Sequence, residues 1–151
     1  MRVHMGTDHA GLETKNALVD VLRARGYEVI DHGAEAYDPE DDYPGFIIPA
    51  AEAVVADPGS VGIILGGSGN GEAIAANKVR GVRAALIHSH DTATLARKHN
   101  NANIASIGAR MHSREQAIDL ALAFLTTDFT HAERHVRRID MITAYEQSVS
   151  A

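Results

Sequence analysis

The residues best suited to chemistry lie in a glycine-rich segment near the middle of the chain. In GIILGGSGNGEAIAANK, residues 62–78, an apolar run breaks into glycines and resumes as an alanine-rich stretch that is typical of a helix. Successive glycines let backbone N–H groups converge on one point, and a helix N-terminus adds positive potential. Such a loop can stabilise an oxyanion that develops during a reaction, and Ser68 could add a hydroxyl donor.

Two familiar nucleotide-binding motifs do not fit this segment. A P-loop requires a lysine directly after its last glycine, and none follows here in register. The dinucleotide pattern GxGxxG/A ends on Glu72 when it starts at Gly67 and on Ile74 when it starts at Gly69, so it fails both times. Glu72 falls in the first turn of the expected helix. Its spacing leaves open whether it does chemistry or only complements the helix dipole.

Two smaller polar pairs flank other predicted elements. Asp8 and His9 are adjacent in GTDHAG, and for this pair taken alone an N-cap role of Asp8 is favoured over catalysis. His99 and Asn100 end a predicted helix, where an imidazolium suits the negative end of the dipole. The residue types of both pairs suit catalysis, but a structural role at a helix end explains their positions equally well.

The segment HAERHVRRID concentrates positive charge near the C-terminus. His131, Arg134, His135 and Arg138 have the spacing i, i+3, i+4 and i+7, which places them on one helical face. A solvated face is the ordinary explanation of such a stripe. In a chain with a net charge of −6, a concentrated cationic face favours a phosphate site, because arginine forks match phosphate oxygens.

The segment HSHD, residues 88–91, contains residue types that ligate metals. If the preceding strand reaches this segment, His88 and His90 point to the same face, with Asp91 beside them. No separate motif supplies an obvious third or fourth ligand, so we expect no metal site.

Short β-like and helical stretches alternate along the chain. We expect strands over residues 2–6, 27–31, 60–65, 82–88 and 103–108. We expect helices over residues 12–26, 45–57 (with Pro49 near the first turn), 71–79, 91–100, 113–127 and from about 131 to 145. This alternation predicts an α/β protein of three layers, α/β/α and Rossmann-like, with a five-stranded parallel sheet. Ligands of such sheets bind at the carboxyl ends of the strands, where most of the polar clusters fall.

The overall composition limits the function classes. The 151 residues fit one domain spanning residues 1–151, and the 45% apolar and 23% charged residues are ordinary for a soluble protein. Cysteine is absent, which excludes disulfides, a cysteine–zinc site and a thiol nucleophile. We find no membrane-length apolar run and no signal-peptide layout, so a cytoplasmic location is expected. The net charge of −6 argues against a broad nucleic-acid footprint.

Five segments together resemble a known family. GTDHAG, DYP, GGSGNGEAIAANK, ARKHNNANIASIGAR and ERHVRRI are closely similar to the ribose-5-phosphate isomerase B family, which also contains galactose-6-phosphate and allose-6-phosphate isomerases. The match spans almost the whole chain and is strongest with the subgroup found in actinobacteria. It implies an aldose–ketose isomerisation of a phosphorylated sugar, through an enediolate and without metal or cofactor.

The resemblance implies ribose 5-phosphate and ribulose 5-phosphate as substrates. Another four- to six-carbon sugar phosphate, of the erythrulose-, allose- or galactose-phosphate type, is an alternative. A non-catalytic ligand-binding module on the same fold is a further alternative. Family members are homodimers or tetramers of dimers whose active sites are shared between subunits, which implies that the C-terminal helix reaches a partner's substrate.

The resemblance also implies roles for individual residues. Many members use a cysteine as the base at the position of Gly66, whereas the similar subgroup uses a glutamate at the position of Glu72. By this resemblance His99 and Asp8 assist ring opening, and Ser68 joins the catalytic group. The implied substrate-binding residues are His9, Tyr43, Gly67, Gly69, Asn70, Gly71, Asn100, Arg110, Arg134 and Arg138.

Overall fold

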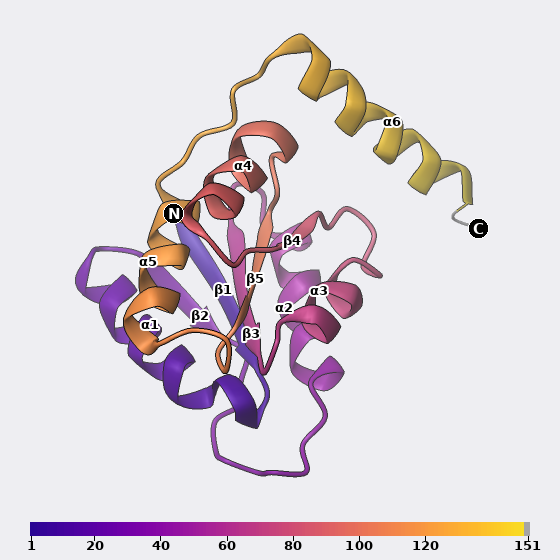
Figure 1. Ribbon diagram of the computed structural model, residues 1–151. Coiled ribbons are helices and arrows are strands. Elements are labelled where there is room, and N and C mark those ends of the chain that lie inside the picture. The colour runs from indigo at the N-terminus through magenta and orange to yellow at the C-terminus, as the bar shows by residue number, and fades with distance from the viewer. Residues whose placement is uncertain (150–151) are drawn as a thin grey trace.

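The computed structural model describes residues 1–149, and a five-stranded sheet lies at its centre (Figure 1). The strands are β1 (Arg2–Thr7), β2 (Glu28–Asp31), β3 (Val61–Gly66), β4 (Ala84–Leu86) and β5 (Ile104–Gly108). Their order across the sheet is β2-β1-β3-β5-β4, and every neighbouring pair is parallel. The predicted parallel sheet is therefore confirmed.

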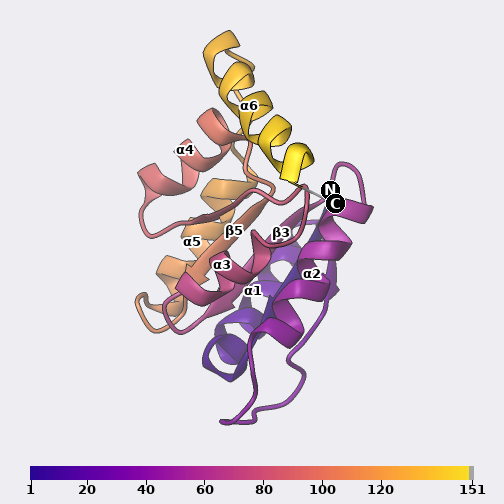
Figure 2. The same cartoon turned by 90° about the vertical axis from the view of Figure 1, so that its right-hand side faces the viewer.

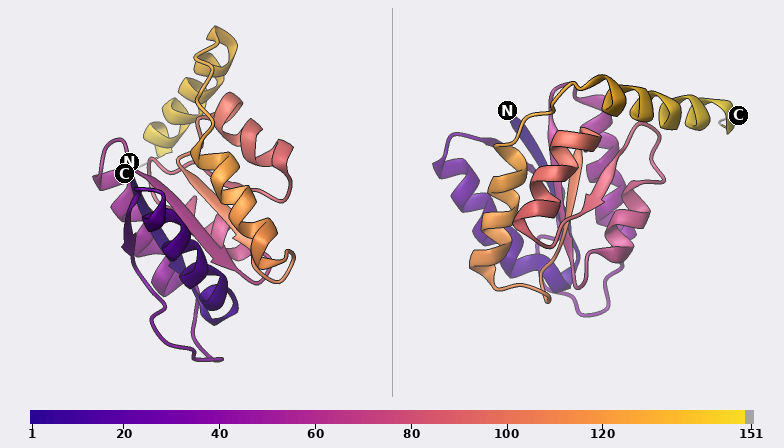
Figure 3. Two further views of the ribbon diagram at one scale, coloured as in Figure 1. Left: turned by 90° about the vertical axis from the view of Figure 1, so that its left-hand side faces the viewer. Right: turned by 45° about the horizontal axis from the view of Figure 1, so that its top comes forward.

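Helices cover both faces of the sheet. They are α1 (Leu12–Ala24), α2 (Pro44–Ala56), α3 (Asn70–Ala76), α4 (His90–Asn100), α5 (Arg114–Leu125) and α6 (Glu133–Val149), with a short 3-10 helix, η1 (His9–Gly11), before α1. One core cluster joins the sheet to α1, α4 and α5, and a second joins it to α2 and α3. Figure 2 shows α2 and α3 in front of the sheet, and the left view of Figure 3 shows α1 and α5 on the opposite face. The predicted three-layer, Rossmann-like fold is confirmed.

The central strand, β3, shows no alternation of apolar and polar residues. All six residues of β3 are buried. Ile63 and Leu65 belong to the cluster with α1 and α5, whereas Ile64 belongs to the cluster with α2. A strand that is covered by helices on both faces reads as a continuous apolar run. This run is followed directly by the glycine-rich loop of residues 67–69, called the glycine loop below.

Several predicted element boundaries are wrong. Pro49 lies inside α2 and not near its first turn, because Pro44 starts that helix. The fourth strand ends at Leu86, so His88 lies outside it and His90 is the first residue of α4. Ser89 caps α4 by accepting a hydrogen bond from the Thr92 amide, which turns the chain away from the sheet.

Helix α6 lies at the top of the layered body in Figure 1 and touches it through the stacked rings of His135 and His99 and through Glu146, which accepts from the Gly81 amide. It exposes the apolar side chains of Met141, Ile142 and Tyr145, which are 66%, 55% and 70% accessible. Within residues 1–149, no helix has the length and apolar character needed to cross a bilayer.

A buried lysine of α1 binds the end of β2 and the turn that follows it. Lys15, on α1, is 1% exposed, and its Nζ donates to both carboxylate oxygens of Asp31 at 2.8 and 2.7 Å. It also donates to the carbonyl of Ala34 at 2.8 Å. The same turn pairs with Thr7, whose amide donates to the Gly33 carbonyl at 2.8 Å. Lys15 therefore holds this turn next to Asp8, the residue that follows β1.

We expect Lys15→Met to lower the free energy of unfolding by about 2–3 kcal/mol. The substitution keeps the volume but leaves the Asp31 carboxylate and the Ala34 carbonyl without their cation. The cost falls below that of a fully buried pair because Asp31 is 28% exposed. Urea denaturation measures it, with the exposed Lys78→Met as the matched control. Equal stability of the two variants would contradict the role given to Lys15.

Candidate active site

The polar residues that follow β1, β3 and β5 meet at one edge of the sheet. Because the strands are parallel, their carboxyl ends lie together. Asp8 and His9 follow β1, the loop of residues 67–69 follows β3, and Arg110 follows β5. The Arg110 amide donates to the Gly67 carbonyl at 3.0 Å, which joins two of these segments directly. The sequence prediction that these clusters share one edge is confirmed.

The Glu72 carboxylate occupies the space above Gly66. Glu72 lies in the first turn of α3 and folds back towards the end of β3. A Cβ placed on Gly66 would overlap the carboxylate group of Glu72. A side chain at position 66 and this orientation of Glu72 therefore exclude each other. This explains physically why a chain with glutamate at position 72 has glycine at position 66.

Glu72 is a buried carboxyl group near a second acid. Its residue is 4% exposed. Burial raises the pKa of Glu72, a hydrogen bond from its own backbone opposes the shift, and the charge of Asp8 raises the pKa further. A carboxyl group with a raised pKa is better matched to accepting and returning a proton near neutral pH.

We expect Gly66→Ala to lower kcat/KM by about 10²-fold, because the added methyl group displaces the Glu72 carboxylate by about 1 Å or more. Steady-state kinetics measure the change. Gly45→Ala is the matched control, since a Cβ at Gly45 would meet no atom within 4 Å. Full activity of Gly66→Ala would mean that the position of Glu72 over Gly66 does not matter.

The glycine loop presents free backbone donors. Within residues 1–149, the amides of Gly67, Ser68 and Gly69 donate to no other residue. Gly69 has φ = 84°, a conformation that favours glycine, and its carbonyl accepts a hydrogen bond from the buried Ser106 hydroxyl at 2.7 Å. These contacts fix the loop with its donors unused. Unpaired amides held in this way can bind an oxyanion.

Ser68 has a structural contact of its own. Its Oγ accepts a hydrogen bond from the Asn70 amide at 3.2 Å, and Asn70 is the first residue of α3. The hydroxyl thus satisfies one backbone donor at the start of the helix. It keeps its own hydrogen available for a substrate oxygen.

Tyr43 and Arg110 lie next to the two ends of the glycine segment. A Cβ on Gly71 would lie 2.6 Å from both Cζ and Oη of Tyr43, so the phenol packs on the first turn of α3, directly after the loop. A Cβ on Gly67 would lie 3.6 Å from Nη1 of Arg110. The structure therefore brings Tyr43 and Arg110 to the same place as Glu72 and Asp8.

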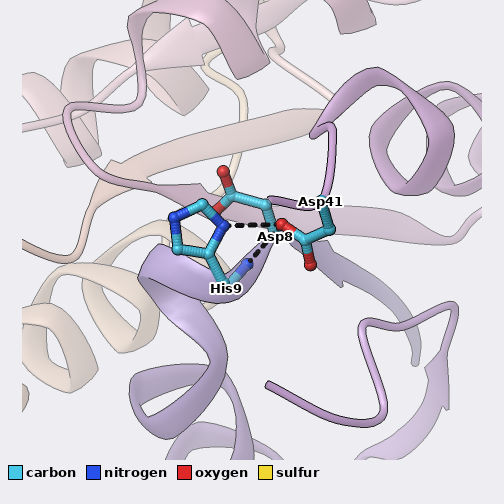
Figure 4. Close-up of side chains that lie close together, drawn as sticks. All are labelled: Asp8, His9 and Asp41. Atoms are coloured by element: carbon cyan, nitrogen blue, oxygen red, sulfur yellow. Dashed lines mark hydrogen bonds and ion pairs between the residues drawn. The ribbon is translucent and has the colours of Figure 1, made fainter. Parts of the chain in front are cut away.

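Asp41 joins Asp8 and His9 in a cluster that the sequence analysis missed (Figure 4). Nδ1 of His9 lies 2.6 Å from Oδ1 of Asp41, and the His9 amide donates to the same oxygen at 3.1 Å. Asp8 caps η1 by accepting from the Ala10 amide at 3.0 Å, and not the predicted helix that starts at residue 12, whose N-cap is Gly11. Asp41 lies 32 residues from His9 in an irregular loop, and no periodic pattern indicates such a contact.

The Asp8, His9 and Asp41 cluster also has the donor set of a cation site. One ligand atom from each residue lies within 4.8 Å of the others. Within residues 1–149 this is the one such group of three, so His88, His90 and Asp91 do not form one. Nδ1 of His9 already bonds Asp41, so only Nε2 of that ring and the carboxylate oxygens are left for a cation there.

Four of the predicted site residues lie at the opposite edge of the sheet. His99 and Asn100 end α4 just before β5 begins, and Arg134 and Arg138 lie on α6. Figure 1 shows α6 beside the end of α4 at the top, whereas the strands point their carboxyl ends to the bottom. The right view of Figure 3 shows the same relation of α6 to α4. A single chain therefore does not bring these four residues to Glu72.

Three of these four residues, His99, Arg134 and Arg138, lie around His135. The rings of His99 and His135 stack with centroids 4.3 Å apart. Burial lowers the pKa of His135, and the charges of Arg134, His99 and Arg138 lower it further. The predicted stripe is wrong in one member, because His131 precedes α6 and has φ = 58°. Arg134 and Arg138 keep their i, i+4 relation on the helix.

Fold and site together define a class of protein. A buried carboxyl group beside unused loop amides, at the carboxyl edge of a parallel sheet, is the arrangement of an enzyme that moves a proton next to a carbonyl group. The chain belongs to the ribose/galactose isomerase family, whose pattern matches residues 3–142.

Relatives and solved structures agree with this family. Ribose-5-phosphate isomerase B of Mycobacterium tuberculosis is 55% identical over 151 residues, which are 100% of this chain and 93% of the relative. The protein of that name from Mycobacterium leprae is 53% identical, with the same coverage. The structure of ribose-5-phosphate isomerase B from Clostridium thermocellum superposes with a TM-score of 0.94 at 39% identity, covering 99% of this chain and 100% of that one. The Mycoplasma genitalium enzyme with bound ribulose-5-phosphate has a TM-score of 0.94 at 37% identity, covering 98% and 97%.

Proposed function

We propose that the protein interconverts ribose 5-phosphate and ribulose 5-phosphate, with Glu72 as the base. The observation that carries the proposal is the buried Glu72 carboxylate over Gly66, beside the unused amides of residues 67–69. The names of the relatives and the ribulose-5-phosphate complex of the Mycoplasma genitalium enzyme support the choice of sugar.

The proposed reaction moves one proton between neighbouring carbons. Glu72 removes the proton from C2 of the open-chain aldose, and the electron pair of that bond forms the C1–C2 double bond as the carbonyl opens to O1⁻. The loop amides and the Ser68 hydroxyl stabilise this enediolate. Glu72 then returns the proton to C1, while the O2 proton moves to O1 and C2 becomes the carbonyl carbon. Atoms and charge balance, and no cofactor enters.

A second copy of the chain completes the proposed site. His99, Asn100, Arg134 and Arg138 lie at the edge of the sheet opposite Glu72, so we assign them to the substrate of a neighbouring subunit. There His99 assists ring opening with the neighbour's Asp8, Asn100 binds sugar oxygens, and the two arginines bind phosphate with its His9 and Arg110. The exposed apolar side chains of α6 support a subunit contact along this helix. A mass measurement in solution distinguishes a dimer from a tetramer of dimers.

A panel of four- to six-carbon aldose and ketose phosphates tests the proposed activity. Purified protein is incubated with each sugar phosphate, and product is followed by ketose formation or by NMR. The highest kcat/KM is expected with ribose 5-phosphate. A higher value with an erythrulose, allose or galactose phosphate would reassign the substrate. Binding without turnover of any member would replace the enzyme proposal with a ligand-binding module.

A further inference from the structure

The carboxylate of Asp41 bonds no described residue except His9. Its Oδ1 receives both the His9 amide, at 3.1 Å, and Nδ1 of the imidazole, at 2.6 Å. The Asp41 side chain is 10% exposed. Within residues 1–149, its other oxygen, Oδ2, is buried and has no hydrogen-bond partner. Figure 4 shows the pair with Asp8 beside it.

A buried carboxylate needs a compensating partner, because it loses its hydration on folding. Here the compensation comes entirely from His9. No helix cap and no lysine or arginine ion pair involves the Asp41 side chain among residues 1–149. Its contacts therefore fix His9 in two ways, at the backbone and at the ring.

The contact decides which ring nitrogen is available. Nδ1 faces Asp41, so Nε2 is left for a ligand. The Tyr37 ring packs against the imidazole, with ring centroids 5.9 Å apart and ring planes at 90°. Asp8, Asp41 and Glu72 make the surroundings negative, and a phosphate dianion binds there only if fixed cations oppose these charges.

We propose that Asp41 is a positioning residue for His9: it holds Nδ1–H inward, presents Nε2–H to the substrate phosphate, and pairs its charge with the imidazolium when phosphate is bound. The inference rests on the proposed function, since it takes His9 as a phosphate ligand of that site. Asp41 acts through His9 and does not touch the reacting carbons. The carboxylate–imidazolium pair makes this ligand ordered and cationic at once.

Steady-state kinetics of Asp41→Asn tests the proposal. Asparagine keeps the volume and an acceptor oxygen but loses the charge. We expect KM for ribose 5-phosphate to rise about tenfold with kcat changed by less than about threefold, because phosphate is held equally in ground and transition states. Asp42→Asn removes the same charge from the adjacent exposed residue and is expected to match the wild type. An unchanged KM in Asp41→Asn overturns the proposal.

A double-mutant cycle separates positioning from general stability. In a His9→Gln background, Asp41→Asn should change KM by less than about twofold, because the residue that it positions is gone. An undiminished tenfold effect in that background would show that Asp41 acts by another route. Imidazole ¹⁵N shifts of the wild type add a test that needs no variant: His9 should carry its proton on Nδ1, and a bare Nδ1 overturns the assignment.

A binding measurement keeps this inference separate from the proposed activity. Calorimetry with inorganic phosphate should show about tenfold weaker binding to Asp41→Asn than to the wild type. This readout does not depend on turnover. Weaker phosphate binding in a protein that isomerises no sugar would refute the proposed function but support the role of Asp41. Equal phosphate binding in an active enzyme would refute the role of Asp41 alone.

Discussion

Glu72→Gln should lower kcat/KM for ribose 5-phosphate by at least about 10²-fold, and the loss should appear in kcat. Glutamine keeps the shape that fills the space over Gly66 but accepts no proton. Substrate binding should therefore survive, as measured by calorimetry on the variant. The matched control is Glu52→Gln, an exposed glutamate on α2, which should behave as the wild type. Wild-type turnover by Glu72→Gln would remove Glu72 from the role of base.

The same substitution should leave the fold as stable as before, or more so, at pH 8. Folding raises the pKa of Glu72, chiefly by burial, so the folded state favours the protonated carboxyl group. The stabilisation from this group is fully present below the unfolded pKa, about 4.3, and is lost as the pH rises through the folded value. Glutamine resembles the protonated form at every pH. The difference in Tm between Glu72→Gln and wild type should thus be zero or positive at pH 8 and should shrink towards pH 4.

A variant that loses activity but not stability separates a catalytic carboxylate from a structural one. A glutamate that only complemented the dipole of α3 would stabilise the fold as an anion, and its removal would lower Tm at pH 8. A lower Tm of Glu72→Gln at pH 8, with activity retained, would support that second explanation. The burial of Glu72 and its proximity to Asp8 are the reasons to expect the opposite.

The parallel fold could be predicted because its signals are local. The apolar run of β3 and the glycines that follow it lie within a few residues of one another, and parallel topology then places Asp8, the loop and Arg110 at one edge. The errors arose where a local cap or backbone conformation, which periodicity does not reveal, changes the limits of an element. Ser89 caps α4 and cuts the fourth strand short, and His131 takes a positive φ that ends the expected stripe.

The candidate site was harder to predict because its contacts cross long stretches of sequence. The relation of Glu72 to Gly66 depends on how α3 folds back on β3, which the spacing alone does not decide. Asp41 lies in an acidic loop where several carboxylates look alike, and only the folded chain pairs one of them with His9. For α6 the difficulty was different. Its cationic residues could be identified from the sequence, but the sequence did not show that they lie far from Glu72 in the same chain.

That distance leads to the second large effect, which is recovery of activity by mixing two inactive subunits. A Glu72→Gln chain lacks the proposed base, and an Arg134→Ala/Arg138→Ala chain lacks the proposed phosphate cations of α6. In a dimer of one chain of each kind, one site receives both defects and the other receives neither. At substrate concentrations well below KM, the mixed dimer should have about half the wild-type activity, although each parent has almost none.

Co-expression with two different affinity tags, followed by purification over both, isolates the mixed assembly. The wild type carrying both tags sets the reference for full activity, and each doubly tagged parent sets the background. Recovery requires that the two halves of a site come from different chains, because a chain that supplied its whole site would be defective in either partner. Activity at the background level in an intact mixed dimer would place Arg134 and Arg138 outside the neighbour's site. Full activity of the Arg134→Ala/Arg138→Ala parent would instead make the stripe on α6 a solvated face, and the phosphate would then depend on His9 and Arg110 alone.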